Sequence, residues 1–467
     1  MIFSRRLFLK QTGLGVAGLG LGAAAAGTSL AAPVKGSSEK LLIKDPDHPQ
    51  PAPKGVDRLP LEWYKAAVGR LKERVAARGV EVIVLEDSWN MTYFTGNFMT
   101  KTERPAWVVF PADADALYWY TPGLDNELVK SWWYSEMDYY YDYLHSAGAY
   151  PDQGKLTKGQ TVDLFAWFLE GLKKRGYGDK VLGFDSEFTP SKAAAFGRIL
   201  PKAKTVDIGA DCLKMRMVKT AEEIALTQRA MDYFSRIHAF SRDYLMERGT
   251  DATDYEIAKA TEEYGVNLIL ADIQRDGRPH NAVGIEVGIG CRTGRGTAYP
   301  HPNQFHHNRV RKGDSLQIAG VVKIGGYGGE CYRYYQIAPW DAYREKIWET
   351  VTESVRIQER ESKAGVRCCD IAFKVHSYQL SRGKDIRKLL YQRVGHGEGM
   401  EGHQPPYIAL GNTDVLEEGM TFSVEPGLFD VANGFGYNPS DSLLVTKSKG
   451  VLQSSVPWTK EWMFLKL

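Results

Sequence analysis

Two glycine-flanked histidines, followed by a carboxylate at the end of an apolar run, constrain this chain more than any other feature. The segment Val394-Gly-His-Gly-Glu-Gly-Met-Glu-Gly-His-Gln-Pro-Pro406 places His396 and His403 seven residues apart. Glycines beside His396 are expected to let a ligand or metal ion approach the backbone closely. Thr421-Phe-Ser-Val-Glu425 then ends in a carboxylate, which is costly to bury unless it is paired or bound to a metal. The pattern predicts a functional site in a strand-rich part of the chain.

The first half of the chain is predicted to form a small domain. Helical and strand-like segments alternate between residues 59 and 207, which is typical of an α/β domain. The expected elements are helices over 61–78 and 156–175 and strands at 81–85, 107–110, 116–120 and 181–184. The strands at 107–110 and 116–120 are expected to form a hairpin.

The second half, residues 208–467, is predicted to be a larger α+β domain. Two capping boxes, Thr220–Glu223 and Thr253–Glu256, each indicate the start of a long helix. The other expected elements are helices over 341–362 and 370–382 and strands at 391–396, 420–425 and 442–447. We expect helices that cover a curved antiparallel sheet.

Composition excludes several classes of protein. Of the 467 residues, 43% are hydrophobic and 25% are charged, as in an ordinary soluble globular protein with room for two cores. The net charge of +2, without a long basic run, gives no indication of a nucleic-acid partner. The odd number of cysteines, five, argues against a disulfide framework.

The N-terminus carries an export signal. Ser4-Arg5-Arg6-Leu7-Phe8-Leu9-Lys10 matches the twin-arginine pattern and precedes a weakly apolar stretch broken by several glycines. That stretch is too poor in large apolar residues for a stable membrane span. Residues 1–32 are therefore predicted to be a signal removed after export to the periplasm by the twin-arginine machinery. The proline-rich residues 33–58 are predicted to be an extended, partly disordered lead.

The histidine-rich motifs are similar to the signature of the pita-bread enzymes, which include creatinase, aminopeptidase P and prolidase. The similar segments are Gly-His396-Gly-x-Gly-x-x-x-His403-x-Pro, Ser-Val-Glu425-Pro-Gly, Tyr-Pro-His301-Pro, Lys312-Gly-Asp-Ser-Leu-Gln-Ile-Ala319 and Asn90-Met-Thr-Tyr-Phe-Thr-Gly96. The resemblance spans about residues 60–467. It implies a creatinase-type N-terminal domain over 59–207, a pita-bread catalytic domain over 208–467 and a homodimer.

The resemblance also implies a metal site that lacks two of its five ligands. The family's dinuclear centre uses two aspartates, one histidine and two glutamates. The matching positions are His396 for the histidine, Glu425 for the first glutamate and Glu330 for the second aspartate. Ala319 stands at the first aspartate and Ser440 at the last glutamate.

Charge limits what this reduced site can hold. Two dications about 3.5–4 Å apart need several carboxylates to bridge and neutralise them. Glu330 and Glu425 supply two negative charges, so a dinuclear peptidase centre is not expected. Two alternatives stay open: no metal, or a single Fe, Mn or Zn ion on Glu330, His396 and Glu425.

The favoured prediction is an enzyme that relies on histidine acid–base chemistry. Creatinase works without metal, and the resemblance matches His301 and His403 to the family's two non-ligand histidines. We predict an exported non-peptidase hydrolase or lyase that cleaves a C–N or related bond in a small cationic metabolite. His301, His403, Glu330 and Glu425 are its predicted catalytic residues. The alternatives are an Xaa-Pro-type metallopeptidase with a mononuclear site and an inactive small-molecule binding protein.

Three further residues are predicted to contact substrate. Arg333 follows Glu330 as it does in the family motif, and Trp132 and Tyr140 belong to a cluster of aromatic and acidic residues at 132–143. Stacked aromatics beside carboxylates suit a cationic group. Packing at a dimer interface is the preferred alternative for this cluster, because tryptophan and tyrosine are common there.

Overall fold

The computed structural model describes residues 37–43, 58–99, 101–141, 162–275, 278–279, 283–301, 307–389 and 393–467. The predicted signal at 1–32 lies outside these ranges, as do parts of the predicted lead, of the helix over 156–175 and of the strand at 391–396. Within the described ranges, no helix has the length and apolar character needed to cross a bilayer.

The N-terminal domain is built on a mixed six-stranded sheet. Its strands, in spatial order, are β4 (Glu136–Tyr140), β3 (Tyr118–Pro122), β2 (Trp107–Pro111), β1 (Val82–Leu85), β5 (Val181–Phe184) and β6 (Lys204–Asp207). Strand β2 runs antiparallel to both β1 and β3, which confirms the predicted hairpin. The remaining pairs β3–β4, β1–β5 and β5–β6 are parallel.

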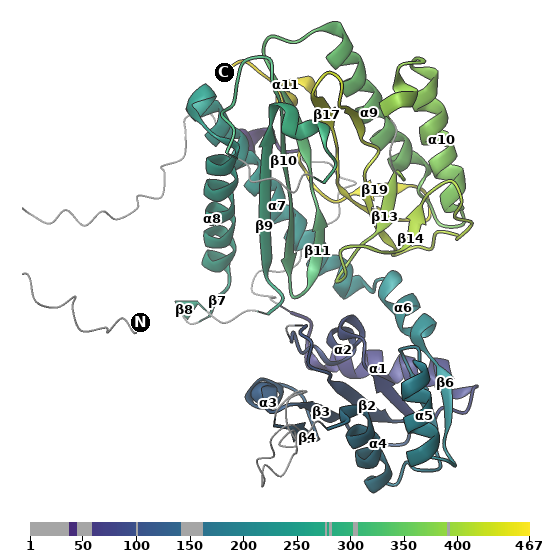
Figure 1. Ribbon diagram of the computed structural model, residues 1–467. Coiled ribbons are helices and arrows are strands. Elements are labelled where there is room, and N and C mark those ends of the chain that lie inside the picture. Colours follow the sequence, from purple (N-terminus) through teal and green to yellow (C-terminus); the bar gives the residue numbers. More distant parts are fainter. Residues whose placement is uncertain are drawn as a thin grey trace, which may run out of the picture. The chain divides into compact units, whose positions relative to one another are not determined.

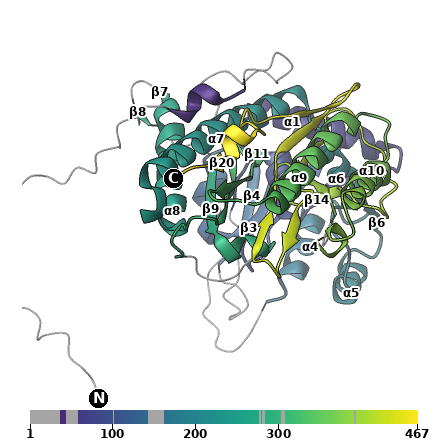
Figure 2. The same ribbon diagram turned by 90° about the horizontal axis from the view of Figure 1, so that it is seen from above.

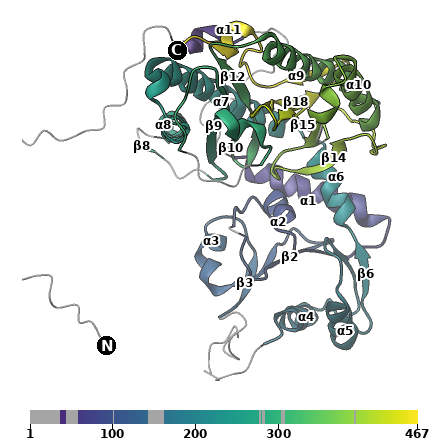
Figure 3. The same ribbon diagram turned by 45° about the horizontal axis from the view of Figure 1, so that its top comes forward.

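Helices cover both faces of this sheet (Figures 1 and 3). On one face lie α1 (Leu61–Ala76), α2 (Ser88–Thr95) and α6 (Gly209–Met217), and on the other α4 (Leu164–Lys174) and α5 (Pro190–Ile199). Successive strand residues enter opposite cores, as with Ile83 and Val84. Ile208 and Cys212 pack in the first core, so the N-terminal core extends past the predicted boundary at residue 207. The short elements are η2 (Gly123–Asp125) and α3 (Asn126–Lys130).

The C-terminal domain contains two five-stranded sheets. The first comprises β9 (Glu286–Thr293), β10 (Ser315–Ile324), β11 (Tyr327–Glu330), β12 (Arg333–Ile337) and β20 (Phe464–Leu465). The second comprises β13 (Gly395–Gly397), β14 (Gln404–Ile408), β15 (Thr421–Val424), β18 (Ser442–Val445) and β19 (Gly450–Leu452). The backbones of Tyr332 and Ser440 exchange hydrogen bonds of 2.9 and 3.3 Å and thereby join the two sheets.

Two helix pairs pack on these sheets (Figures 1 and 2). Helices α7 (Ala221–Arg248) and α8 (Asp254–Asp272) contact the first sheet, and α9 (Ala342–Glu361) and α10 (Cys368–Ser381) contact the second. Both predicted capping boxes are present, and the predicted α+β class is confirmed. The remaining elements are β7 (Gln274–Arg275), β8 (Arg278–Pro279), β16 (Leu428–Asp430), β17 (Phe435–Tyr437), η3 (Gly249–Asp251), η4 (Gly294–Ala298), η5 (Ile386–Leu389) and α11 (Lys460–Met463).

Part of the predicted disordered lead is folded against α7. Residues 37–43 contain η1 (Ser38–Leu41), and Ser38 is fully buried. Its backbone N–H and hydroxyl donate to the Asp243 carboxylate at 2.8 and 2.5 Å, and the N–H of Ile43 donates to Ser455 O at 2.8 Å. For these residues the expectation of an extended, partly disordered segment is wrong, because the half-buried carboxylate of Asp243 holds the buried Ser38.

Replacement of Asp243 by Ala is expected to lower the free energy of unfolding by about 1–3 kcal/mol, because it leaves the buried N–H and hydroxyl of Ser38 without an acceptor. Urea unfolding measures this change. Glu39→Ala is the control, since it removes only the exposed ion pair with Arg236 and should cost less than about 1 kcal/mol. Equal small effects would contradict the docking of this segment.

His238, inside α7, makes stability depend on pH. Its Nε2 lies 2.9 Å from Cys331 O, and burial together with the Arg333 charge lowers its pKa to about 3. Between about pH 3 and pH 6.5 the unfolded chain binds a proton that the folded chain does not, so stability falls as pH decreases through this window.

His238→Gln removes that titration. Between pH 6.5 and 4.5 the wild-type protein should lose about 2 kcal/mol more unfolding free energy than the variant. Urea unfolding at the two pH values measures the difference. Parallel losses in the two proteins would show that His238 titrates normally in the folded state.

Candidate functional site

His396 lies in the middle of the second sheet, where strands approach unusually closely. On β13 it faces Ser423 of β15 and Tyr407 of β14. A Cβ atom at Gly397 would lie 2.6 Å from Pro405 O, and one at Gly395 would lie 2.7 Å from Ser423 O. The two glycines are therefore required for contact between strands, whereas the sequence suggested that they admit a ligand.

The imidazole of His396 has a fixed orientation. The ring is fully buried, and its Nδ1 lies 3.1 Å from Gly397 O, which can only accept a hydrogen bond. Nδ1 therefore carries the proton, and Nε2 points toward Glu425 Oε2 at 3.2 Å and Glu330 Oε2 at 3.8 Å. A lone pair held against two carboxylates needs a proton or a cation between them, and a backbone hydrogen bond on the other nitrogen is typical of a metal-binding histidine.

Glu330 stands at the junction of the two sheets. The Ser423 hydroxyl donates to its Oε2 at 3.0 Å, and Ser440 Oγ lies 2.7 Å from Ser423 Oγ. Ala319 lies on the same face of β10 as Val321, the residue directly opposite Glu330. The two positions that lack a carboxylate therefore border the cluster of Glu330, His396 and Glu425.

His403 and His301 are also brought to this site. The His403 ring is exposed and lies 4.0 Å from the His396 ring, centre to centre. Partial burial and then the charge of His396 lower the pKa of His403. The charge of the exposed His301 lowers the same pKa further, so His301 acts on His403. Among the described residues, Glu330, His396 and His403 form a group whose ligand atoms all lie within 4.8 Å of one another.

Burial and mutual repulsion shift the acidic groups. Burial, followed by the charges of Glu425 and Glu398, raises the pKa of Glu330 to about 7. Burial acts to lower the pKa of His396, but the hydrogen bond and charge of Glu425 and the charge of Glu330 outweigh it, and the pKa is raised. Without a cation, the raised pKa values of Glu330 and His396 therefore favour a proton held within the cluster.

Three residues near Glu330 were not singled out in the sequence. Glu398 is buried, and its Oε2 accepts the backbone N–H of Glu330 at 3.2 Å. Tyr332 hydrogen-bonds to Glu330, and its pKa is raised by burial and by the charges of Glu330 and Glu425. Arg292 lies near Tyr332. The Nη1 of Arg292 donates to Tyr299 O at 2.7 Å and to Pro300 O at 3.0 Å. Glu398 was visible within the histidine motif, whereas Arg292 and Tyr332 carry no motif of their own.

The predicted substrate contacts are elsewhere. Arg333 lies opposite Ile318, on the other face of the sheet from Ala319, and is fully buried in an ion pair with Asp441 at 2.6 Å. Tyr140 is buried in the N-terminal core with its hydroxyl 3.0 Å from Pro105 O. Trp132 is half-buried, donates to Thr95 O at 2.8 Å and stacks under Arg58. These contacts argue against substrate binding by Arg333 and Tyr140 and favour a packing role for Trp132.

The donor set fits one divalent ion and does not fit two. Donors about 2.0–2.2 Å from a tetrahedral ion lie about 3.3–3.6 Å apart, close to the separations of 3.2 and 3.8 Å around His396 Nε2. Glu330 and Glu425 balance one dication. A second ion would need carboxylates at Ala319 and Ser440, which offer a methyl group and a hydroxyl.

Comparison with known proteins relates both domains to known families. Residues 220–447 match the Metallopeptidase family M24, and residues 68–218 match the Creatinase/Prolidase N-terminal domain. The putative dipeptidase YkvY of Bacillus subtilis is 26% identical over 294 residues, which is 62% of this chain and 74% of that protein. The Xaa-Pro dipeptidase of Lactobacillus delbrueckii subsp. lactis is 24% identical over 365 residues, or 77% of this chain and 89% of that protein.

Solved structures show the same fold. The crystal structure of recombinant prolidase from Thermococcus sibiricus has a TM-score of 0.65 and 19% identity, covering 84% of this chain and 97% of that one. The expected architecture, a pita-bread domain preceded by a creatinase-type α/β domain, is confirmed.

The charge argument predicts metal stoichiometry. The wild-type protein should bind no more than one Mn²⁺ or Zn²⁺ per chain, and the double variant Ala319→Asp/Ser440→Glu should bind two, because it restores the carboxylates that a second ion needs. Elemental analysis after equilibrium dialysis measures both. The neutral double variant Ala319→Asn/Ser440→Gln is the control and should stay at the wild-type value. Two tightly bound ions in the wild-type protein would refute the argument.

Proposed function

Because this chain belongs to the metallopeptidase family M24 and carries a creatinase/prolidase N-terminal domain, we propose that it hydrolyses the C–N bond of small, dipeptide-like amides with one divalent ion. The observation that carries the proposal is the fully buried His396, whose Nε2 is aimed at the carboxylates of Glu425 and Glu330. Relatives named as dipeptidases support an amide substrate. They favour the metallopeptidase alternative over the non-peptidase chemistry that the sequence suggested, whereas the single ion is inferred from the two carboxylates of Glu330 and Glu425.

The residues of the site would have three different roles in this reaction. Glu330, His396 and Glu425 would hold the ion, which supplies Lewis-acid polarisation of a carbonyl and activation of water when bound. His403 has an exposed ring against His396, so it is placed to move a proton between the site and solvent. Arg292 ties down the backbone of Tyr299 and Pro300 and so positions the adjacent His301.

A second candidate follows from the same cluster. The carboxylates of Glu330, Glu425 and Glu398 act together on the single imidazole of His396. A fixed cation on a small metabolite would balance them as well as a metal ion does, and His403 and His301 would then transfer the protons. This is the metal-free hydrolase or lyase predicted from the sequence, and a catalytically inactive binding protein is its limiting case.

Turnover with and without metal separates these functions. The metal-stripped protein is assayed on Xaa-Pro dipeptides, other dipeptides and guanidinium compounds, before and after addition of Mn²⁺ or Zn²⁺. Dipeptide hydrolysis that depends on one equivalent of metal supports the proposal. Turnover of a cationic metabolite by the stripped protein would replace it with the second candidate, and no turnover in any condition would leave a binding protein.

His403→Ala is expected to lower kcat about 10²- to 10⁴-fold, because general acid–base catalysis contributes that much. The thermal midpoint should stay near wild type, since the ring is exposed. Because a ring nitrogen of His403 lies within 4.8 Å of the ligand atoms of Glu330 and His396, metal content is measured on the same variant: unchanged metal assigns the loss to proton transfer, and lost metal makes His403 a ligand instead. Glu425→Gln is the contrasting variant and should lose the metal itself, because it removes a ligand carboxylate. If His403→Ala keeps full activity, His301→Ala tests the other histidine, and full activity in both would exclude histidine proton transfer.

A further inference from the structure

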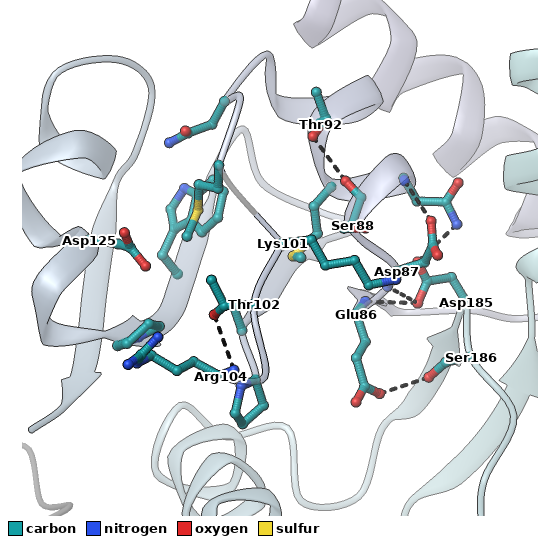
Figure 4. A pocket seen from close by; sticks show the side chains of 18 of the residues that line it. Glu86, Asp87, Ser88, Thr92, Lys101, Thr102, Arg104, Asp125, Asp185 and Ser186 are labelled. Carbon is teal, nitrogen blue, oxygen red and sulfur yellow. Dashed lines mark hydrogen bonds between the residues drawn. The ribbon is translucent and has the colours of Figure 1, made fainter. Parts of the chain in front are cut away.

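The N-terminal domain contains a cavity of about 670 Å³ that the proposed chemistry does not use (Figure 4). It is lined by the start of α2, residues 97, 99 and 101–106, Asp125, Asp185 and part of α6. Its volume lies within the roughly 300–1,000 Å³ of ordinary small-molecule sites. Met91, Met99 and Leu213 give it apolar surface beside its polar groups.

One wall of the cavity is a closed polar network. Asp185 accepts the backbone N–H of Glu86 at 2.8 Å and the Asn90 amide at 3.0 Å. Asn90 Oδ1 accepts from Arg216 at 2.9 Å, and Arg216 also pairs with Glu401 at 2.8 Å. These groups already have partners, so they shape the cavity without offering free donors or acceptors.

Three other groups that line the cavity find no partner among the residues that the structure describes. Neither the exposed Lys101 nor the half-buried Asp125 carboxylate makes a hydrogen bond or a close ion pair with any of those residues. Arg104 acts on Asp125 only at longer range, and burial raises the pKa of Asp125. Asn97 is 4% exposed, and its Nδ2 is a buried donor without an acceptor in the described part of the chain.

Opposite charges that share a cavity without pairing indicate the ligand. Figure 4 shows Asp125 on one side of the cavity, the Asp87 and Asp185 wall on the other, and Lys101 between them. An ammonium ion would satisfy Asp125, and a carboxylate would satisfy Lys101 and the Asn97 amide. A ligand with only one charge would leave one of these groups unpaired.

We propose that this cavity binds a zwitterion, a free amino acid or short peptide, with its ammonium group on Asp125 and its carboxylate on Lys101 and Asn97. The apolar surface from Met91, Met99 and Leu213 would accommodate the side chain. This site is separate from the His396 centre and does not depend on the function proposed for that centre.

Calorimetric titration of the full chain with L-leucine tests the site. Asp125→Asn and Lys101→Gln should each weaken binding about tenfold or more, because a lost charge-assisted hydrogen bond carries at least that factor. N-acetyl-leucine lacks the ammonium group and leucinamide lacks the carboxylate. Both should therefore bind the wild-type protein about as weakly as leucine binds the two variants. N-acetyl-leucine should lose nothing further in Asp125→Asn, and leucinamide nothing further in Lys101→Gln.

Matched control variants separate a local effect of the cavity charges from a general effect of net charge. Glu170→Gln and Lys174→Gln make the same charge changes on the exposed side of α4 and should leave leucine binding unchanged. Glu425→Gln should also leave it unchanged, which separates this cavity from the His396 centre. The proposal is overturned if millimolar leucine does not bind, if both cavity variants bind it normally, or if Glu425→Gln abolishes binding. An unchanged thermal midpoint in Asp125→Asn and Lys101→Gln confirms that both variants fold.

Discussion

The close approach of three strands around His396 determines the chemistry of the C-terminal domain. Gly395 and Gly397 allow β14 and β15 to pack against β13 with no room for a side chain. The imidazole is then held by the Gly397 carbonyl, with Nε2 3.2 Å from Glu425 Oε2 and 3.8 Å from Glu330 Oε2. Because an uncompensated lone pair beside two negative charges is costly in a buried place, the backbone geometry alone requires a proton or a cation there.

The junction of the two sheets explains why the cluster can lose carboxylates and keep its shape. Beneath Tyr332 and Ser440, the fully buried Arg333–Asp441 pair is anchored further, since Arg333 also donates to Ser440 O at 2.9 Å and Val456 O at 2.9 Å. Removing one partner of such a pair is costly, so the junction resists change. The Arg333–Asp441 pair and the backbone of Ser440 hold the junction, whereas side chains set the charge of the cluster, so the lack of a carboxylate at Ala319 and Ser440 changes the charge without removing these contacts.

Local motifs predicted the parts of the site that depend on neighbours in sequence. His396, Glu425 and Glu330 lie together as expected: His396 is the middle residue of β13, Glu330 ends β11 and Glu425 follows β15 directly. Arg333 was misassigned because three residues along a hairpin carried it to the opposite face of the sheet. Arg292 was missed because its place follows from the register of β9 on β10, which pairs it with Gln317 and which no local pattern reveals. Docking of residues 37–43 rests on residues distant in sequence, chiefly Asp243 and Ser455, so nothing in the local polar segment indicated it. Export, periplasmic location and the homodimer stay predictions.

The polar network behind Asp185 gives the N-terminal domain a part in the catalytic site. It runs from Asp185 through Asn90 and Arg216 to Glu401, two residues before His403, and Arg216 is 7% exposed. A buried and fully paired chain of this kind is stiff, because breaking any link leaves a charged group without a partner. The loop that carries His403 is therefore held from the N-terminal side, by the same arginine that forms part of the cavity wall. The segment that carries His403 is thus in contact with the N-terminal domain through Arg216, even though Glu330, His396 and Glu425 all belong to the C-terminal domain.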